Sequence, residues 1–326
     1  MNFSTYRRLI KTFIISKLGK YKPLTAFYNV TFRCNFKCSF CNNWKRSINE
    51  LSEADALKVI KRIGDFGVPA ISFSGGEPLL RRDIYNLALE AKDYGCIVSM
   101  NSNGYLINSH VAEKLAKVFD YIIISIDGPP KLHDKFRGVI GAYEKAVEAI
   151  KLLRKNGVKI GVNTVVSREN MNSIIPLWRS LEEKVDFFTI QPINPPSSNF
   201  KEENVRTFIS SILAFKKKSK SLVPLPVSYI TGMGDYLLHR AEKICHAAKL
   251  YFMVQPNGMV TACSPREDLV IGNILETPLD EILKVGDEQV KAAIASCKGC
   301  WLTCTTGISL IFKASIIDLL AYVKLR

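Results

Sequence analysis

Apolar segments that alternate with helix-like segments constrain the fold of this 326-residue chain more than any other feature. The apolar segments lie in AFYNVTFRC, AISFSGGEP, CIVSMNSNG, YIIISIDGP, KIGVNTVVS and FFTIQPINP, and a helical period between the first two opens at Ser52 and ends at Gly67. Continuous apolar strands separated by helices predict a parallel sheet covered by helices. We therefore expect an α/β fold, a partial (β/α)6 TIM-like barrel, with polar motifs at the carboxyl ends of its strands.

Cysteines at short spacing point to a metal site. The segment CNFKCSFC contains Cys34, Cys38 and Cys41, and the chain has nine cysteines in all, an odd number. This distribution suits metal sites in a reducing compartment better than disulfide bonds, so we expect a cytoplasmic protein. A four-iron cluster held by three thiolates leaves one iron open, whereas a structural zinc ion would need a fourth ligand that the loop does not supply.

The three cysteines and the segment GGEP on the next strand resemble the signature of the radical S-adenosylmethionine (radical SAM) superfamily. The resemblance implies that Cys34, Cys38 and Cys41 hold a 4Fe-4S cluster whose open iron chelates S-adenosylmethionine. In that superfamily the reduced cluster cleaves the cofactor to a 5'-deoxyadenosyl radical, which abstracts hydrogen from an unactivated carbon. The electron would come from a donor such as ferredoxin or flavodoxin.

The same resemblance assigns roles around GGEP. Glu77 would accept the methionine ammonium, and Gly75 and Gly76 would let the backbone approach the cofactor closely. Phe40, just before the last cysteine of the loop, would pack near the adenine. Outside this context a pair of glycines is typical of a turn, and Phe40 fits an ordinary core aromatic equally well.

The fourth strand leads into SIDGPPKLHDKFRG, which is similar to a segment of radical SAM enzymes that modify peptides and sulfatases. That similarity implies that Ser125 and Arg137 meet the S-adenosylmethionine carboxylate, since a guanidinium can bind a carboxylate through two hydrogen bonds. The alternative places Arg137 on a solvated loop. We expect His133 and Asp134 to be structural. Three further residues end strands at this rim and either touch cofactor or substrate or satisfy loop backbone: Asn103, Asn163 and Gln191.

The second cysteine group lies in the last third of the chain. Two strands around PNG predict a hairpin with a cysteine beyond each outer end. The whole region resembles the SPASM/twitch extension of radical SAM enzymes. Five thiolates cannot fully ligate two cubes, so we expect one auxiliary 4Fe-4S cluster, with a structural zinc ion as the alternative. Its ligands would be Cys245 and Cys263 with two of the last three cysteines, and which one is spare stays open: Cys297, Cys300 and Cys304.

These features divide the chain into five expected segments. They are an amphipathic basic helix at 1–23, the radical SAM core barrel at 24–200, a basic connecting segment at 201–240, the SPASM/twitch-like cluster domain at 241–306, and an apolar helix at 307–326.

Charge and the two termini suggest a membrane surface. The formal net charge is +15 and no acidic residue precedes Glu50, which favours an anionic partner. In YRRLIKTFIISKLGK the apolar residues fall on one helical side, a pattern typical of a helix in a membrane interface. The C-terminal helix is too short to span a bilayer. We therefore expect peripheral contact with the inner face of the membrane, the alternative being two helices that close the ends of the barrel.

Our leading functional hypothesis is a radical SAM enzyme that abstracts hydrogen from the hydrocarbon chain of a membrane lipid, for C–C bond formation or a related modification. The first alternative is a peptide maturase that forms thioether or C–C crosslinks. The second is a non-catalytic, nucleic-acid-binding metalloprotein, but it leaves Glu77 and Arg137 unexplained, and we expect no nucleic-acid partner.

Overall fold

The computed structural model describes residues 3–196, 200–219, 221 and 223–313. Six strands coincide with the apolar segments of the sequence, and each strand pairs in parallel with the next one. Their bounds are β1 Thr25–Thr31, β2 Ala70–Gly75, β3 Ile97–Ser102, β4 Tyr121–Ser125, β5 Lys159–Val166 and β6 Phe187–Pro192. The predicted α/β barrel with six β/α units is therefore confirmed.

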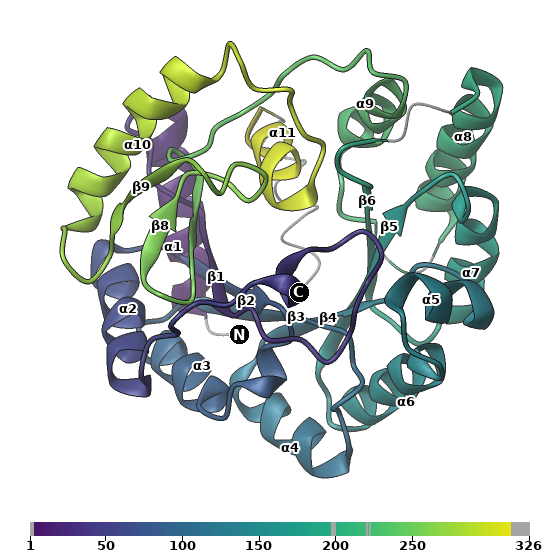
Figure 1. Ribbon diagram of the computed structural model, residues 1–326, viewed down its shortest axis with the longest axis horizontal. Coiled ribbons are helices and arrows are strands. Elements are labelled where there is room, and N and C mark those ends of the chain that lie inside the picture. The colour runs from purple at the N-terminus through teal and green to yellow at the C-terminus, as the bar shows by residue number, and fades with distance from the viewer. Residues whose placement is uncertain (1–2, 197–199, 220, 222, 314–326) are drawn as a thin grey trace.

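Helices cover the outer face of this curved sheet, and the loop that follows β1 crosses in front of the strands (Figure 1). In the first of these helices, α2 Glu53–Phe66, the Ser52 side chain caps the start by accepting a hydrogen bond from the backbone N–H of Asp55. Gly67 ends this helix with a φ of 95°. Both ends of this helix lie where the sequence predicts them, because they depend on local capping. The covering helices are α2 Glu53–Phe66, α3 Ile84–Asp93, α4 Ser109–Val118, α5 Pro130–Arg137, α6 Ala142–Lys155 and α7 Ile174–Leu181.

The predicted hairpin is not a sheet of its own. It consists of β7 Tyr251–Val254 and β8 Met259–Thr261, and β9 Val270–Asn273 adds a third strand. β7 pairs in parallel with β1, so one sheet runs in the order β6-β5-β4-β3-β2-β1-β7-β8-β9. An unpaired β1 edge would leave backbone groups unsatisfied, which explains why the hairpin docks there. The helix that follows, α10 Leu279–Ala293, begins after Pro278 without a hydrogen bond from a capping side chain.

The region 201–240 is more ordered than the expected basic connection. It contains α8 Glu202–Lys218 and α9 Val227–Leu237, which pack on each other, and α9 also contacts β6. The lysines of FKKKSK fall mostly in the last turn of α8, where positive charge complements the helix dipole. The helical period was hidden in the sequence by this run of charge and by the prolines that follow it.

The N-terminal helix α1 Phe3–Lys17 packs against protein. Leu9 and Phe13 are buried, and the Phe13 ring meets Phe312 of α11 Ile308–Lys313 edge to face, with 5.6 Å between ring centroids. This packing supports the alternative that the terminal helices close the barrel. Residues 314–326, most of the predicted C-terminal helix, lie outside the described residues. Among the described residues no helix combines the length and the apolar content needed to cross a bilayer.

Arg8 fixes α1 to the amino-terminal side of the barrel. Its guanidinium donates to the carbonyl oxygens of Gly64 and Gly67 at the end of α2 and to that of Tyr94 at the end of α3. We expect Arg8→Ala to lower the free energy of unfolding by ~2 kcal/mol, because charged hydrogen bonds to orphan helix-end carbonyls are lost. Urea denaturation measures this change. The exposed neighbour Arg7 offers the control, and equal losses in Arg7→Ala and Arg8→Ala would contradict the anchoring role.

Candidate active site

The loop after β1 brings Cys34, Cys38 and Cys41 together. The backbone N–H of Phe36 donates to Cys34 Sγ at 3.4 Å, and burial raises the pKa of the Cys34 thiol to about 11. Such N–H···S bonds stabilise thiolates that ligate iron–sulfur clusters, and a bound cluster would offset the cost of a buried thiolate. Among the described residues no group of three or more His, Cys, Asp or Glu side chains could hold a single metal ion.

The two glycines of GGEP are required by packing. A Cβ on Gly75 would lie 2.1 Å from the carbonyl oxygen of Thr31, and a Cβ on Gly76 would lie 2.1 Å from that of Arg33. Both glycines therefore let the end of β2 approach the start of the cysteine loop. Their predicted role was only a close approach of the backbone to the cofactor. Asn43 adds a hydrogen bond from Nδ2 to the Gly75 carbonyl oxygen, at 2.9 Å. These contacts fix the cysteine loop on the end of β2.

Glu77 is buried beneath this loop. Its carboxylate accepts hydrogen bonds from the backbone N–H of Leu79 and Asn103, at 3.2 and 2.8 Å, and from the hydroxyl of Ser102 at 2.9 Å. Burial nevertheless raises its pKa to about 7. A carboxylate has about four acceptor positions, so capacity for one further donor remains.

Arg137 is buried rather than solvated. Its Nε donates to Asp127 Oδ2 at 2.7 Å, its Nη1 lies 3.9 Å from Cys38 Sγ, and its guanidinium lies 5.3 Å from the centre of the Phe40 ring. Asp127, fully buried, also accepts a hydrogen bond from the backbone N–H of Val165 at 3.0 Å. Asp127 was not predicted as a site residue, although it lies in SIDG between Ser125 and Arg137, which were.

The neighbouring polar residues of α5 are structural, as expected. His133 accepts a hydrogen bond at Nδ1 from the backbone N–H of Asp127, and burial lowers its pKa to about 4, so it is neutral at pH 7. The carboxylate of Asp134 accepts from the backbone N–H groups of Gly141 and Tyr143 at the start of α6. Phe40 packs edge to face on Phe136, at 6.4 Å between ring centroids.

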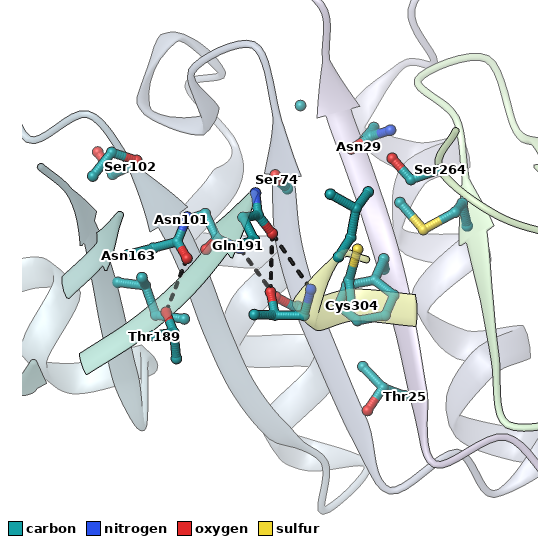
Figure 2. Close-up of a pocket in the computed structure, with 18 of the residues that line it drawn as sticks. Thr25, Asn29, Ser74, Asn101, Ser102, Asn163, Thr189, Gln191, Ser264 and Cys304 are labelled. Atoms are coloured by element: carbon teal, nitrogen blue, oxygen red, sulfur yellow. Dashed lines mark hydrogen bonds between the residues drawn. The ribbon is translucent and has the colours of Figure 1, made fainter. Parts of the chain in front are cut away.

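A cavity of about 440 Å³ extends from the cysteine loop into the barrel. Neutral polar side chains line part of it, and Figure 2 shows several of them around one space. Asn163 accepts a hydrogen bond from the hydroxyl of Thr189 at 3.0 Å, and Gln191 accepts one from Thr303 at 3.1 Å. Five of the polar residues predicted to bind cofactor or substrate line this cavity: Asn103, Ser125, Arg137, Asn163 and Gln191. Glu77 is buried behind its wall and is not among the described residues that line it. Asn103 also satisfies loop groups, because its Nδ2 donates to Asn35.

Trp44 is a cavity residue that the sequence analysis did not identify. It follows the third cysteine of the loop and lines the cavity, and its indole N–H is buried without a partner among the described residues. The ammonium groups of Lys37 and Lys45 lie 5.7 and 5.1 Å from the centre of its ring system. A buried donor without an acceptor is costly, so this N–H is available to an acceptor on a water molecule or on a bound molecule.

The second cysteine group lies beside the open side of the barrel. Cys245, Cys297 and Cys300 are close enough to Cys263 to interact electrostatically with it, and burial raises the pKa of the Cys263 thiol to about 12. The backbone N–H of Gly299 donates to Cys297 Sγ at 3.4 Å, the same kind of bond as at the first loop. Buried thiols with such donors suit a second cluster.

The remaining two cysteines occupy different surroundings. Cys304 interacts electrostatically with Cys300 and Cys263 and also lines the cavity. Cys96 is buried in the main core and donates to the carbonyl oxygen of Val68 at 3.3 Å, away from both groups.

Comparison with known proteins agrees with this arrangement. A family profile described as "Radical SAM superfamily" matches residues 28–179, and one described as "Iron-sulfur cluster-binding domain" (SPASM) matches residues 245–301. The pre-heme d1 synthase of Dinoroseobacter shibae is 37% identical over 298 residues, which cover 81% of this chain and 74% of that protein. The Fe-coproporphyrin III synthase of Methanosarcina barkeri is 35% identical over 52% of this chain, which spans under half, 43%, of that protein. A PqqA peptide cyclase of Gluconobacter oxydans is 25% identical over 81% of this chain and 77% of its own length.

Solved structures share the fold at lower identity. AdoMet-bound anSMEcpe superimposes with a TM-score of 0.69 and 18% identity, covering 93% of this chain and 97% of that one. SuiB of Streptococcus suis superimposes with a TM-score of 0.69 and 20% sequence identity, covering 87% of this chain and 71% of that one. Since the identity to the Dinoroseobacter protein extends over most of both chains and the two profiles fall on the two cysteine groups, this chain belongs to the radical SAM superfamily with a SPASM domain, and it is an enzyme that uses S-adenosylmethionine, a 4Fe-4S cluster and an auxiliary iron–sulfur cluster.

Proposed function

We propose that this enzyme abstracts a hydrogen atom from an unactivated carbon of a substrate held in the barrel cavity. The observation that carries the proposal is that Cys34, Cys38 and Cys41 line that cavity. The bound 4Fe-4S cluster and S-adenosylmethionine supply the 5'-deoxyadenosyl radical. A one-electron donor such as ferredoxin or flavodoxin supplies the electron.

The protein's own residues bind and orient the cofactor. Arg137, held by Asp127 beside Cys38, offers its remaining N–H groups to the cofactor carboxylate, and Ser125 lines the same wall. Glu77 accepts the methionine ammonium at its remaining acceptor position. The Phe40 ring packs against the guanidinium and limits water around it.

For the substrate we propose a heme-type tetrapyrrole. The support is that two sequence relatives with 35–37% identity are named for the synthesis of heme-related compounds. The positive charge of the chain and the two lysines beside Trp44 are suited to attracting the carboxylates of such a macrocycle.

Two other substrates remain candidates. A peptide is favoured by the 25% identity to a PqqA peptide cyclase along most of both chains. The membrane lipid expected from the sequence has its support in the apolar inner part of the cavity, where Phe27, Ile97 and Met253 could contact an alkyl chain. Peripheral membrane contact has less support, because the buried side of α1 is occupied by protein.

The test is an anaerobic assay of the reconstituted, reduced enzyme. 5'-Deoxyadenosine is measured alone, with iron–coproporphyrin III, with total lipid extract and with a synthetic peptide library. We expect the macrocycle to raise cofactor cleavage and to change in mass. A stimulation confined to lipid or to peptide would replace the proposed substrate, and absence of cleavage in all arms would overturn the radical chemistry.

The raised pKa of Glu77 makes cofactor binding pH-dependent. The pKa lies near 7 instead of 4.5, so without ligand the folded state loses stability as the pH rises between these values. A bound ammonium favours the ionised carboxylate, so S-adenosylmethionine should bind more tightly as the pH rises from ~5 to ~8 and should release a proton below neutral pH. Titration calorimetry in two buffers of different ionisation enthalpy measures both effects.

The matched variant for this prediction is Glu77→Gln. We expect weaker binding, no pH dependence and no proton release, with the iron content of the reconstituted protein unchanged. Unaltered affinity or an unaltered proton release in the variant would remove Glu77 from the cofactor site.

A further inference from the structure

We propose that two buried hydroxyl groups, those of Tyr251 and Thr305, raise the reduction potential of the auxiliary cluster by donating hydrogen bonds to the thiolates of Cys245 and Cys300. Both are positioning residues that act through the cluster ligands and touch no substrate. Their role depends on the auxiliary cluster of the SPASM domain and not on the identity of the substrate.

Tyr251 is the first residue of β7, and its side chain is fully buried. Its hydroxyl oxygen lies 3.7 Å from Cys245 Sγ, which is its hydrogen-bond partner within the described part of the chain. A tyrosine hydroxyl carries its proton at neutral pH, whereas a cysteine that ligates iron is a thiolate without a proton. When Cys245 ligates the cluster, the hydroxyl of Tyr251 is therefore the donor of this pair.

Thr305 makes the shorter of the two contacts. Its hydroxyl oxygen lies 3.1 Å from Cys300 Sγ and 3.4 Å from the carbonyl oxygen of Leu302. A hydroxyl group has one proton to donate, and an anionic acceptor makes the stronger hydrogen bond. Thr305 is only 1% exposed, so bulk water does not compete for this proton. We therefore expect Thr305 to donate to the thiolate of Cys300.

The backbone that carries both hydroxyls is held by neighbouring strands. Tyr251 pairs with Thr25 of β1 at the start of β7. Thr305 lies on the π-helical turn Thr303–Gly307, and a hydrogen bond from this turn to Gln191 ties it to β6. Such turns are frequent at functional sites. The donors are thus in place before the cluster changes its charge, and little reordering is needed.

The effect on the potential follows from charge. One-electron reduction adds a negative charge to the cluster and its thiolates, and a donor on a ligand sulfur stabilises that charge. Hydrogen bonds to the sulfurs are among the factors that set the potentials of iron–sulfur clusters. Both hydroxyls are buried, where such bonds are stronger than in water. With them the auxiliary cluster is reduced more easily than the same cluster without them.

The first cysteine loop offers an internal reference. Among the described residues the hydrogen-bond donors to its sulfurs are nitrogen groups, the backbone N–H of Phe36 at Cys34 and the guanidinium of Arg137 at Cys38. Removal of a hydroxyl near the second cysteine group leaves these contacts intact. The potential of the first cluster should therefore stay constant in every variant below.

The test is a redox titration of the reconstituted protein, followed by electron paramagnetic resonance. Tyr251→Phe and Thr305→Val remove the hydroxyls and keep the shapes of the side chains. We expect each variant to make reduction of the auxiliary cluster about tenfold less favourable, which lowers its midpoint potential by ~59 mV for one electron. The Cys38→Ala variant, which should keep only the auxiliary cluster, identifies the signal that belongs to it. The measurement needs neither S-adenosylmethionine nor a substrate, so it is independent of the proposed function.

Two matched variants should keep the wild-type potential. The hydroxyl of Tyr236 bonds to Asn194 instead of a sulfur, although Tyr236 is close enough to Cys300 to interact with it electrostatically. We therefore expect no shift in Tyr236→Phe, and none in Thr305→Ser, which keeps a hydroxyl group.

Three results would contradict the proposal. An unchanged potential in Tyr251→Phe or in Thr305→Val would overturn the role of that hydroxyl. An equal shift in Tyr236→Phe would show that the bond to sulfur is not responsible. Loss of about four irons per chain from both Tyr251→Phe and Thr305→Val would replace the effect on the potential by a purely structural role.

Discussion

Replacing Cys38 by alanine is expected to reduce 5'-deoxyadenosine formation to the level of a protein-free control. Cys38 is the most buried of the three loop cysteines, and its sulfur lies 3.9 Å from Arg137 Nη1. Two thiolates cannot hold a cube in the geometry that leaves one defined open iron, so cofactor chelation and cleavage should fail together. This is the largest functional effect that we expect from a single substitution.

Iron content and cofactor cleavage are measured on the same reconstituted sample. The variant should keep the auxiliary cluster, with about four irons per chain instead of about eight. Cys96→Ala is the matched control, because it removes a buried thiol that lies in the main core and donates to the Val68 carbonyl oxygen. Normal cleavage by the Cys38 variant would refute the cluster assignment.

Asp127→Ala is expected to cause the largest loss of stability, ~3–5 kcal/mol, because it leaves the buried Arg137 guanidinium without its partner. The side chains of this pair are 9% and 0% exposed, with 2.7 Å between Arg137 Nε and Asp127 Oδ2. The variant also leaves the backbone N–H of Val165 unsatisfied.

Urea denaturation at pH 7 measures this effect against an exposed ion pair. Lys135 and Glu169 lie 2.7 Å apart with side chains 68% and 52% exposed, so Glu169→Ala should cost less than ~1 kcal/mol. Asp127→Asn, which keeps one acceptor oxygen, should fold better than Asp127→Ala and still bind S-adenosylmethionine more weakly than the wild type. If Asp127→Ala and Glu169→Ala were equally stable, the buried pair would have no structural role.

Much of the barrel could be predicted because its signals are local. The capping at Ser52, the end at Gly67 and the apolar runs of β2 to β6 depend on neighbouring residues only. Two features were not predicted, for the opposite reason. The parallel pairing of β7 with β1 joins segments more than 200 residues apart, and the helix α8 was hidden by its lysines.

In the candidate site, too, features that depend on neighbouring residues could be predicted and those that depend on tertiary contacts could not. The residues that the family signature marks could be named from the sequence, and most of them line one cavity. Neither Asp127 nor Trp44 belongs to a sequence motif whose spacing would have marked it as a site residue. Their importance follows from a buried ion pair and from an unpartnered N–H, and both depend on what surrounds the side chain.

The sequence by itself determined the class of fold and the two groups of cysteines, because strand period, helix caps and ligand spacing are properties of short segments. The cofactor chemistry came from the resemblance of these short motifs to the radical SAM signature. Only the tertiary structure decided that α1 packs on the barrel, that Gly75 and Gly76 serve backbone packing, and that Cys304 faces the cavity. These depend on contacts between distant segments, where burial and hydrogen bonding select one arrangement from several that the same local pattern allows.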